Sequence, residues 1–280
     1  MDTSQQAATA EAFRARHRRK PVLLLPNVWD AMSARLFEAA GFEAVATTSG
    51  GVAWALGYPD GEKTPWREVV DATARIVRAA KGPVSADIEA GYGATPDEVG
   101  AHVAEIIGAG VVGINLEDGL HATPPIRTLD DAASRIAAAR AAAQRAGVPI
   151  VINARCDLYF WQVGDEAGRF AAAVERCRAY LAAGADCVYP FGLRDPKVIA
   201  DLVAAVGAPV NITGRAGMPD AAALEAIGVA RITIATAPAL VAMSAVRALA
   251  QELRATGRFD ALLASMRHPD AQALFAAPEP

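Results

Sequence analysis

The stretch Lys81-Gly82-Pro83-Val84-Ser85-Ala86-Asp87-Ile88-Glu89-Ala90-Gly91-Tyr92-Gly93 shows how this chain is built. Its Gly-Pro pair is typical of the end of a helix, and the Val-led run after it predicts a short buried strand. The run closes on two acidic side chains and a glycine-rich turn. A Gly or Pro signal followed by a short β-rich run recurs along the chain, which predicts alternating strands and helices.

Eight such runs define the predicted fold. The first starts 209 residues before the last, which over seven steps is about 30 residues each, the length of one strand–helix unit. Eight parallel units predict a closed (β/α)8 TIM barrel, an α/β fold. An open doubly wound sheet is disfavoured, because residues 26–30 after the first run hold no Gly-x-Gly-x-x-Gly motif. The predicted strands are Val22–Asn27, Ala44–Ser49, Val84–Ala90, Val111–Asp118, Ile150–Asp157, Cys187–Gly192, Val210–Gly214 and Arg231–Thr236.

Composition excludes several classes of protein. Of 280 residues, 53% are hydrophobic and 21% charged, which excludes overall disorder. The longest charge-free runs, 44–59 and 232–246, are shorter than the roughly 18 residues of a membrane span. A net charge of -4 argues against a nucleic-acid partner, and the basic cluster at 14–20 is interpreted as a solvated first helix. Three cysteines without C-x-x-C spacing predict reduced thiols and a cytoplasmic protein.

No linker or shift of composition divides the chain. We therefore expect one domain over residues 1–280, with the barrel at about 20–240 and C-terminal helices at about 241–276. Those helices are expected to break near Thr256-Gly257.

Polar side chains gather where the predicted strands end, and a parallel barrel carries its active site at the C-terminal ends of its strands. Asp87 and Glu89 end the third strand and, two residues apart, are expected on one face of it. Glu117 ends the fourth strand, and Asn153 and Arg155 lie near the end of the fifth. Crowded carboxylates repel each other unless a cation neutralises them, and oxygen-only ligands favour Mg²⁺ or Mn²⁺. We expect Asp87, Glu89 and Glu117 to hold that metal, although any single acid could instead be a helix cap or a surface charge.

These residues resemble the isocitrate lyase and phosphoenolpyruvate mutase superfamily over about residues 24–235. The acidic Gly-Tyr-Gly motif of the third strand is the most specific of the matching motifs, which follow one another at successive strand ends. They are Pro26-Asn27-Val28-Trp29-Asp30-Ala31, Thr47-Thr48-Ser49-Gly50-Gly51, Gly57-Tyr58-Pro59-Asp60-Gly61-Glu62, Asp87-Ile88-Glu89-Ala90-Gly91-Tyr92-Gly93, Leu116-Glu117-Asp118 and Asn153-Ala154-Arg155.

The resemblance implies a barrel that uses Mg²⁺ to hold a small 2-oxo acid or its enolate. It implies that Asp87 contacts the metal, while Asp60, Glu89 and Glu117 support it through water. The backbone of Ser49-Gly50-Gly51 is expected to bind the substrate carboxylate, since N–H groups of a Gly-rich turn form an anion cradle. Arg155 is expected to supply positive charge, with Asn153 and Asn211 among the substrate-binding residues. The resemblance also implies a homodimer or homotetramer that exchanges C-terminal helices.

One loop departs from the family pattern. Lyases of this kind carry a Lys-Lys/Arg-Cys-Gly-His loop after the fourth strand, and the mutases and phosphonate hydrolases carry a Lys-rich loop there. Residues 119–126 contain neither Cys nor Lys. This favours a decarboxylase or another carbon–carbon lyase over isocitrate lyase or mutase chemistry. Arg155, Glu117 and His121 are the candidate catalytic residues, and His121 could supply a proton or be an exposed loop histidine.

Two alternative functions stay open at this stage. One is phosphonate chemistry, such as hydrolysis of phosphonopyruvate or a phosphoenolpyruvate mutase-type reaction. The other is a barrel that binds a 2-oxo acid without converting it, because the loop that normally carries catalysis is altered.

Overall fold

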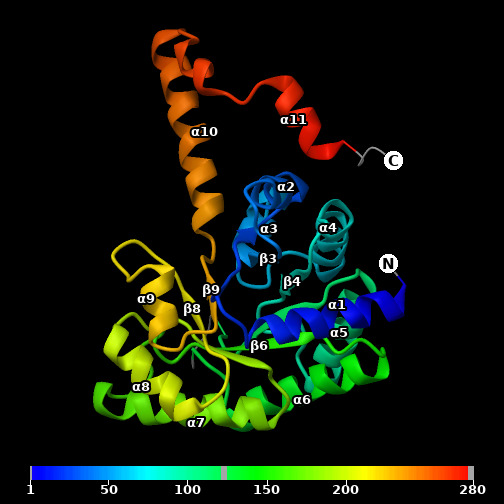
Figure 1. Ribbon diagram of the computed structural model, residues 1–280, viewed down its shortest axis with the longest axis vertical. Helices are drawn as coiled ribbons and strands as arrows, with labels where there is room; N and C mark the ends of the chain where they lie inside the picture. Colours follow the sequence, from blue (N-terminus) through cyan, green and yellow to red (C-terminus); the bar gives the residue numbers. More distant parts are fainter. Residues whose placement is uncertain (1, 121–124, 277–280) are drawn as a thin grey trace.

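A computed structural model describes residues 2–120 and 125–276, and it has the expected barrel of parallel strands surrounded by helices (Figure 1). The strands are β1 Leu23–Leu24, β2 Asn27–Val28, β3 Val45–Thr47, β4 Val84–Asp87, β5 Gly113–Glu117, β6 Val151–Cys156, β7 Cys187–Pro190, β8 Asn211–Thr213 and β9 Arg231–Thr233. The helices are α1 Thr3–Arg16, α2 Ala31–Ala39, α3 Ser49–Leu56, α4 Trp66–Ala79, α5 Pro96–Gly108, α6 Leu129–Arg145, α7 Glu166–Ala182, α8 Pro196–Val206, α9 Ala221–Ala226, α10 Ala237–Thr256, η1 Asp260–Ala264 and α11 His268–Phe275.

The barrel closes through its first predicted strand, which forms two short strands instead of one. β1 pairs with β9, and β2 pairs with β3. Pro26 lies between them and has no N–H to donate, which interrupts the ladder. On the opposite side, a single parallel bridge between Val188 and Val210 joins β7 to β8. The order β2 to β7, then β8, β9 and β1, therefore completes a ring.

Several predicted strands extend too far at their C-terminal ends. The third was expected over Val84–Ala90, but β4 ends at Asp87. Glu89 has φ 51°, a left-handed conformation that strands do not adopt. Strand alternation therefore does not apply to Glu89, and the prediction that Asp87 and Glu89 lie on one face of a strand is wrong. The tight turn after β4 brings Glu89 to the barrel mouth instead.

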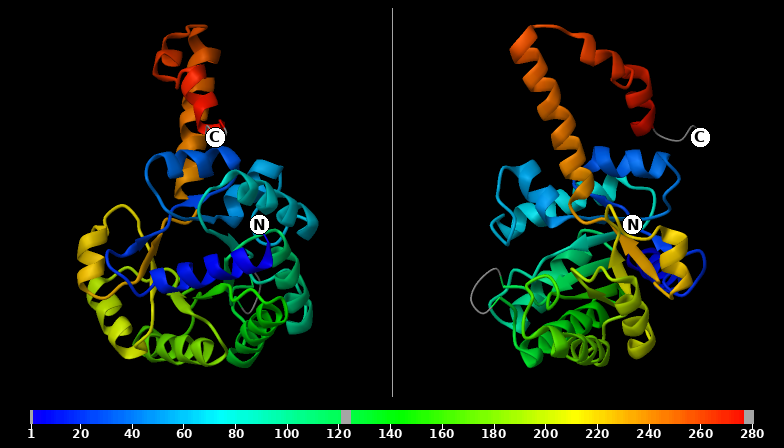
Figure 2. Two further views of the ribbon diagram at one scale, coloured as in Figure 1. Left: turned by 45° about the vertical axis from the view of Figure 1, so that its right-hand side comes forward. Right: turned by 90° about the vertical axis from the view of Figure 1, so that its left-hand side faces the viewer.

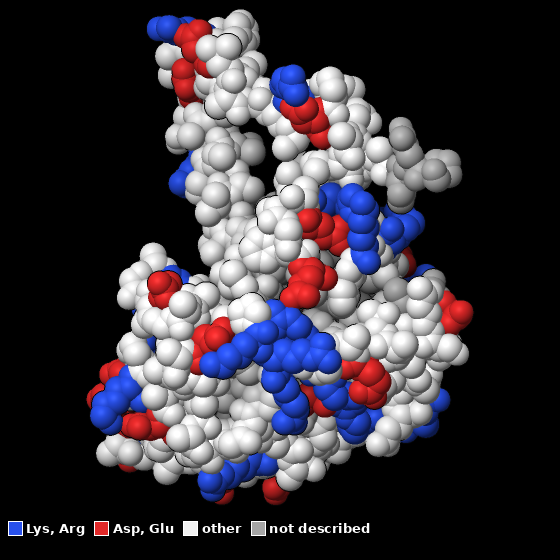
Figure 3. Space-filling view, viewed as in Figure 1, with Lys and Arg blue, Asp and Glu red and all other residues white. Residues whose placement is uncertain are grey.

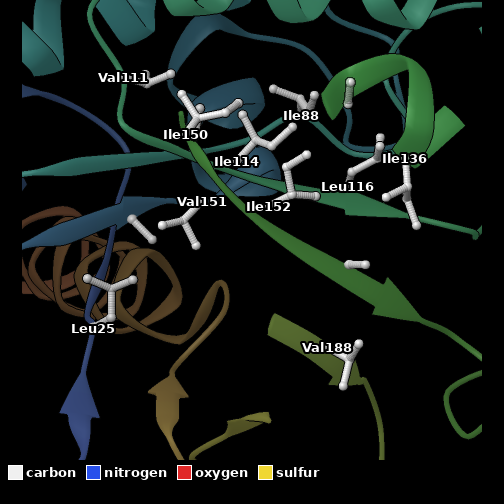
Figure 4. Packing of buried hydrophobic residues seen from close by; sticks show 14 of the residues in the cluster. Leu25, Ile88, Val111, Ile114, Leu116, Ile136, Ile150, Val151, Ile152 and Val188 are labelled. Atoms are coloured by element: carbon white, nitrogen blue, oxygen red, sulfur yellow. The ribbon is translucent and has the colours of Figure 1, made fainter. Parts of the chain in front are cut away.

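Aliphatic side chains from the strands and alanines from the helices form the core. Ile114, Leu116, Ile150 and Ile152 of adjacent strand segments lie close together and are almost fully buried (Figure 4). On α6 the inner face is mostly small, with Ala132, Ala139, Ala142 and Ala143 all buried. Alanine favours helix and lets a helix approach its neighbours closely, which explains its use in the outer ring.

Helix α1 lies across the N-terminal end of the barrel (Figure 2). Its Phe13 side chain fills the space beside Gly113, where an added Cβ would lie 3.0 Å from the ring. The Gln6 amide donates to the carbonyls of Ile107 and Val111, at 2.8 and 2.9 Å. The first helix, interpreted from its basic cluster as solvated, is therefore packed against the barrel on one face.

The buried His17, just after α1, is expected to make the folding stability of the protein sensitive to acid. The side chain is 4% exposed, its Nδ1 hydrogen-bonds the Phe13 carbonyl, and burial followed by nearby Arg231 lowers its pKa to about 4. An unfolded histidine takes up a proton near pH 6.5, while the folded one stays neutral to about pH 4. Stability is therefore expected to fall between pH 6.5 and pH 4, by about 3 kcal/mol from this group.

Melting temperatures at pH 7 and pH 5 check this expectation. A His17→Leu variant should lose part of the pH dependence, whereas His268→Gln, which changes an exposed histidine of α11, should keep all of it. An unchanged pH dependence in the His17 variant would show that another group controls it.

The C-terminal segment forms an arm that projects from the barrel (Figures 1 and 2). α10 ends at Gly257, whose φ of 65° suits a left-handed helix cap, and this is where the break was predicted. α11 returns to α2, where the Arg35 guanidinium donates to the Leu274 carbonyl at 2.7 Å. None of the described helices is long and apolar enough to cross a membrane. All three cysteines are free and buried.

Candidate active site

A cavity of about 450 Å³ opens at the C-terminal ends of the strands. Four carboxylates line it, those of Asp60, Asp87, Glu89 and Glu117, together with the Arg155 guanidinium. They come from the segment after α3, from β4 and its following turn, and from β5 and β6. Side chains that are far apart in the sequence are thus collected at one mouth of the barrel.

Asp87 is held by three neighbouring elements. Its Oδ1 accepts from Asn115 Nδ2 of β5 at 3.1 Å, and its Oδ2 accepts from the Ser49 N–H of α3 at 3.2 Å. Its own N–H donates to Thr47 Oγ1 of β3 at 2.8 Å. Contacts from three elements fix the carboxylate at the edge of the cavity.

Glu89 is a buried acid, only 3% exposed. Its Oε1 accepts from the Tyr92 hydroxyl at 2.6 Å, and its Oε2 accepts from the Glu62 N–H at 2.7 Å. Burial, and then the nearby carboxylates of Asp60, Asp87 and Glu117, raise the pKa of Glu89 to about 8, although the Tyr92 hydrogen bond acts to lower it. The mouth of the barrel is therefore crowded with acidic groups, and Glu89 holds a proton more readily than an ordinary carboxylate.

Arg155 joins two carboxylates at the end of β6. Its Nη1 lies 2.5 Å from Glu117 Oε2, and its Nε lies 2.6 Å from Asp157 Oδ1. The guanidinium also lies over the Phe191 ring, 3.8 Å from the centroid. Burial acts to lower the pKa of Arg155, but Asp157 and Glu117 outweigh it and raise that pKa above its usual value. Arg155 therefore stays charged beside the cavity.

The two predicted asparagines occupy different positions. Asn211 lines the cavity and donates to Thr233 Oγ1 at 3.1 Å. Asn153 does not line it, and donates instead to Asn115 Oδ1 at 2.7 Å. Because Asn115 in turn donates to Asp87, Asn153 reaches the site through a second side chain.

Ser49 lines the cavity, while Gly50 and Gly51 do not. They begin α3, so the expected Gly-rich turn is the first turn of a helix, whose N–H groups also attract anions. At Gly50 an added Cβ would lie 2.9 Å from both Asp60 Oδ2 and Thr236 Cγ2. At Gly51 it would lie 2.7 Å from Thr48 Cγ2. Only glycine lets α3 pack this closely.

A Gly50→Ala variant is expected to be folded but impaired. The new methyl group would push Asp60 from its place, and small displacements at a site can reduce kcat/KM by roughly 10- to 100-fold. Steady-state assays of the variant check this. The matched control is Gly108→Ala at the end of α5, where an added Cβ meets no atom within 4 Å and activity should be unchanged. Full activity in Gly50→Ala would contradict the packing argument.

The donor set fits a hard divalent cation that keeps much of its water. Within residues 2–120 and 125–276, no three His, Cys, Asp or Glu side chains are grouped as a ready metal site. Glu89 is engaged by Tyr92 and Glu62, and Glu117 faces Arg155, so the three predicted carboxylates do not form one direct ligand set. Mg²⁺ commonly takes one or two protein carboxylates and several waters. Asp87 could be the directly bound carboxylate, with the other lining carboxylates reached through water. A cation there would offset the mutual repulsion of these acids.

His121 lies outside the described residues, but the two ends of its loop are placed. Gly119 and Ile126 form an antiparallel bridge, and Leu120 N–H donates to the Pro125 carbonyl at 2.9 Å. An added Cβ on Gly119 would lie 2.6 Å from Asp157 Oδ2. The loop is thus anchored beside the acid that pairs with Arg155.

Several lining residues were not among the predicted site residues. Phe160 and Phe191 form an aromatic wall, and Thr236 and Leu240 reach the cavity from the start of the C-terminal arm. The Tyr189 hydroxyl hydrogen-bonds Thr213 across β7 and β8. Tyr189, Thr213 and Arg215 are polar residues at strand ends and line the cavity as that position indicates, whereas nothing local marks the aromatic wall. Cys156, beside Arg155 in sequence, is fully buried.

Comparison with known proteins places this geometry in a family. The family model described as phosphoenolpyruvate phosphomutase matches residues 13–254. Oxaloacetate decarboxylase of Chromohalobacter salexigens is 32% identical over 82% of this chain and 79% of that protein. A proposed lyase/mutase from Burkholderia cenocepacia has a solved structure with TM-score 0.91 and 39% identity, covering 99% of this chain and 98% of that one. Oxaloacetate acetylhydrolase, solved with its product oxalate, has TM-score 0.83 and 26% identity, covering 96% and 93%. The chain therefore belongs to the isocitrate lyase/phosphoenolpyruvate mutase superfamily, whose characterised members are lyases and mutases.

Proposed function

We propose that this enzyme cleaves a C–C or C–CO₂ bond in a small 2-oxo or 2-hydroxy dicarboxylate through an enolate, with Mg²⁺ or Mn²⁺ as cofactor. The observation that carries the proposal is the convergence of Asp60, Asp87, Glu89 and Glu117 with Arg155 on one cavity. The similarity to an oxaloacetate decarboxylase and an oxaloacetate acetylhydrolase supports the same bond and substrate class.

The chain's own residues supply most of the binding and charge. A cation held at Asp87 would polarise the oxygen atoms of a 2-oxo acid. The first turn of α3, from Ser49, presents backbone N–H groups to the substrate carboxylate. Arg155 stabilises negative charge as the enolate develops, and its contacts with Glu117 and Asp157 hold the guanidinium in place for this. The proton that ends the reaction is assigned to His121 as a prediction.

A panel of substrates distinguishes this function from its alternatives. The enzyme is incubated with 2-oxo and 2-hydroxy dicarboxylates and with phosphonopyruvate, in Mg²⁺ or in excess chelator. Mg²⁺-dependent appearance of a shorter oxo acid or of CO₂ is expected. Phosphate release from phosphonopyruvate would support C–P chemistry instead. The match to the phosphoenolpyruvate phosphomutase family model is the reason to include this substrate. Thermal stabilisation by these acids without any product would support a binding barrel.

We also propose a homodimer or homotetramer held by the C-terminal arm. Nine of the thirteen exposed large hydrophobic side chains of the described residues lie at 240–275, including Val241 at 70% and Leu263 at 89% exposure. Much of the arm's surface is uncharged (Figure 3). Light scattering should give a multiple of 29.1 kDa, and a monomer would reject this assembly. The cytoplasmic location and the single domain of barrel plus arm stay predictions.

A further inference from the structure

The cavity has two chemically different walls. The carboxylates of Asp60, Asp87 and Glu89 lie on elements early in the barrel. The ends of β6, β7 and β8 instead contribute cations and aromatic rings, among them Arg215 just after β8 and Phe191 just after β7. A substrate in this cavity therefore meets both acidic and basic groups, and these come mostly from different strands.

Two arginines share the Phe191 ring but differ in their partners. The Arg155 and Arg215 guanidinium carbons lie 3.8 and 5.3 Å from its centroid. Arg155 is paired with Glu117 and Asp157. The structure gives Arg215 no ion pair or side-chain hydrogen bond with any residue of 2–120 or 125–276.

Arg215 also lies in positively charged surroundings. The side chain is half-buried, and the two cations that act on it electrostatically are Arg194 and Arg155. Burial, and then these two cations, lower the pKa of Arg215, although Tyr189 acts to raise it. A half-buried cation among cations is favourable when an anion accompanies it, and a guanidinium binds a carboxylate through two parallel hydrogen bonds.

We propose that Arg215 binds a second anionic group of the substrate, a distal carboxylate, so that the enzyme selects doubly charged oxo acids over singly charged ones. This rests on the proposed function, because it assumes that the 2-oxo acid end binds at Asp87 and α3. The Phe191 ring holds the planar guanidinium in the cavity wall by a cation–π contact. A cavity of about 450 Å³ is within the size range of small-ligand sites.

The test uses three probes in the presence of Mg²⁺, each titrated by calorimetry into the full-length protein. Oxalate occupies the metal end only. 2-Oxoglutarate adds a distal carboxylate, and 2-oxopentanoate has the same chain length with a methyl group in place of that carboxylate. Wild type is expected to prefer 2-oxoglutarate to 2-oxopentanoate. Arg215→Gln should weaken the binding of 2-oxoglutarate about 10- to 100-fold, which is the effect of losing one charged hydrogen-bonded pair. It should leave oxalate and 2-oxopentanoate nearly unchanged.

Two further variants separate contact from general charge. Arg194→Gln removes the same charge from an exposed side chain near Arg215 that does not line the cavity, and should leave all three affinities nearly unchanged. Arg215→Lys should recover part of the preference for 2-oxoglutarate. Equal losses in Arg194→Gln and Arg215→Gln, equal weakening of oxalate and 2-oxoglutarate, or no preference in wild type would each overturn the assignment. Failure of the proposed function looks different, since Asp87→Ala would then still bind oxalate with Mg²⁺.

Discussion

Replacing Asp87 by Ala is expected to reduce kcat/KM by about 1,000-fold or more, because metal polarisation of the substrate supplies several kcal/mol of transition-state stabilisation. Wild type should gain thermal stability with Mg²⁺ and a further increment with oxalate, and the variant should show neither shift. β5 and α3 hold the carboxylate of Asp87 and β3 holds its backbone N–H, so the side chain has a fixed position at the cavity.

The same substitution should not unfold the protein. Asp87 sits among Asp60, Glu89 and Glu117, and removing one negative charge relieves repulsion, so the melting temperature without metal should be equal or higher. Asp201→Ala is the matched control, since that exposed acid of α8 pairs with Lys197 on the surface. Mg²⁺ and oxalate shifts that persist in Asp87→Ala would remove Asp87 from the site.

Replacing Arg155 by Met is expected to cost both activity and stability. The change leaves Glu117 and Asp157, which are 5% and 1% exposed, without their common cation. Breaking a buried ion pair by removing one partner typically lowers the free energy of unfolding by about 3–5 kcal/mol. Loss of positive charge at the enolate should lower kcat roughly 100- to 1,000-fold.

Denaturant titration and steady-state kinetics measure the two effects separately. Arg155→Lys keeps the charge but cannot pair both acids in the same planar geometry, so it should recover stability better than activity. Arg169→Met is the control on the outer helix α7, where the guanidinium donates to backbone carbonyls of the preceding loop. If Arg155→Met were as stable as wild type, the two acids would need another source of neutralisation.

Local signals in the sequence located the barrel strands and most of the candidate site. The Gly and Pro residues before Val84 and Ile150 could be interpreted from the sequence alone. A helix end and a strand start depend on backbone preferences within a few residues. The acids at 87, 89 and 117 could be assigned to one mouth because parallel strands all end on the same side. The left-handed Glu89 was missed because it depends on how neighbouring segments pack, and the split of the first strand was missed although Pro26 marks it locally.

The sequence by itself determined a parallel barrel with carboxylates at one mouth and a helical arm at its C-terminal end. Only the tertiary structure decided which partner each side chain has. Asn153 reaches Asp87 through Asn115, Arg155 is paired with two acids, and Arg215 lies unpaired over Phe191 among the described residues. Strand spacing sets the order of residues around the mouth. Apart from Asp157, which is two residues from Arg155, these partners are 24 to 38 residues apart in the sequence, and no local pattern encodes such pairings.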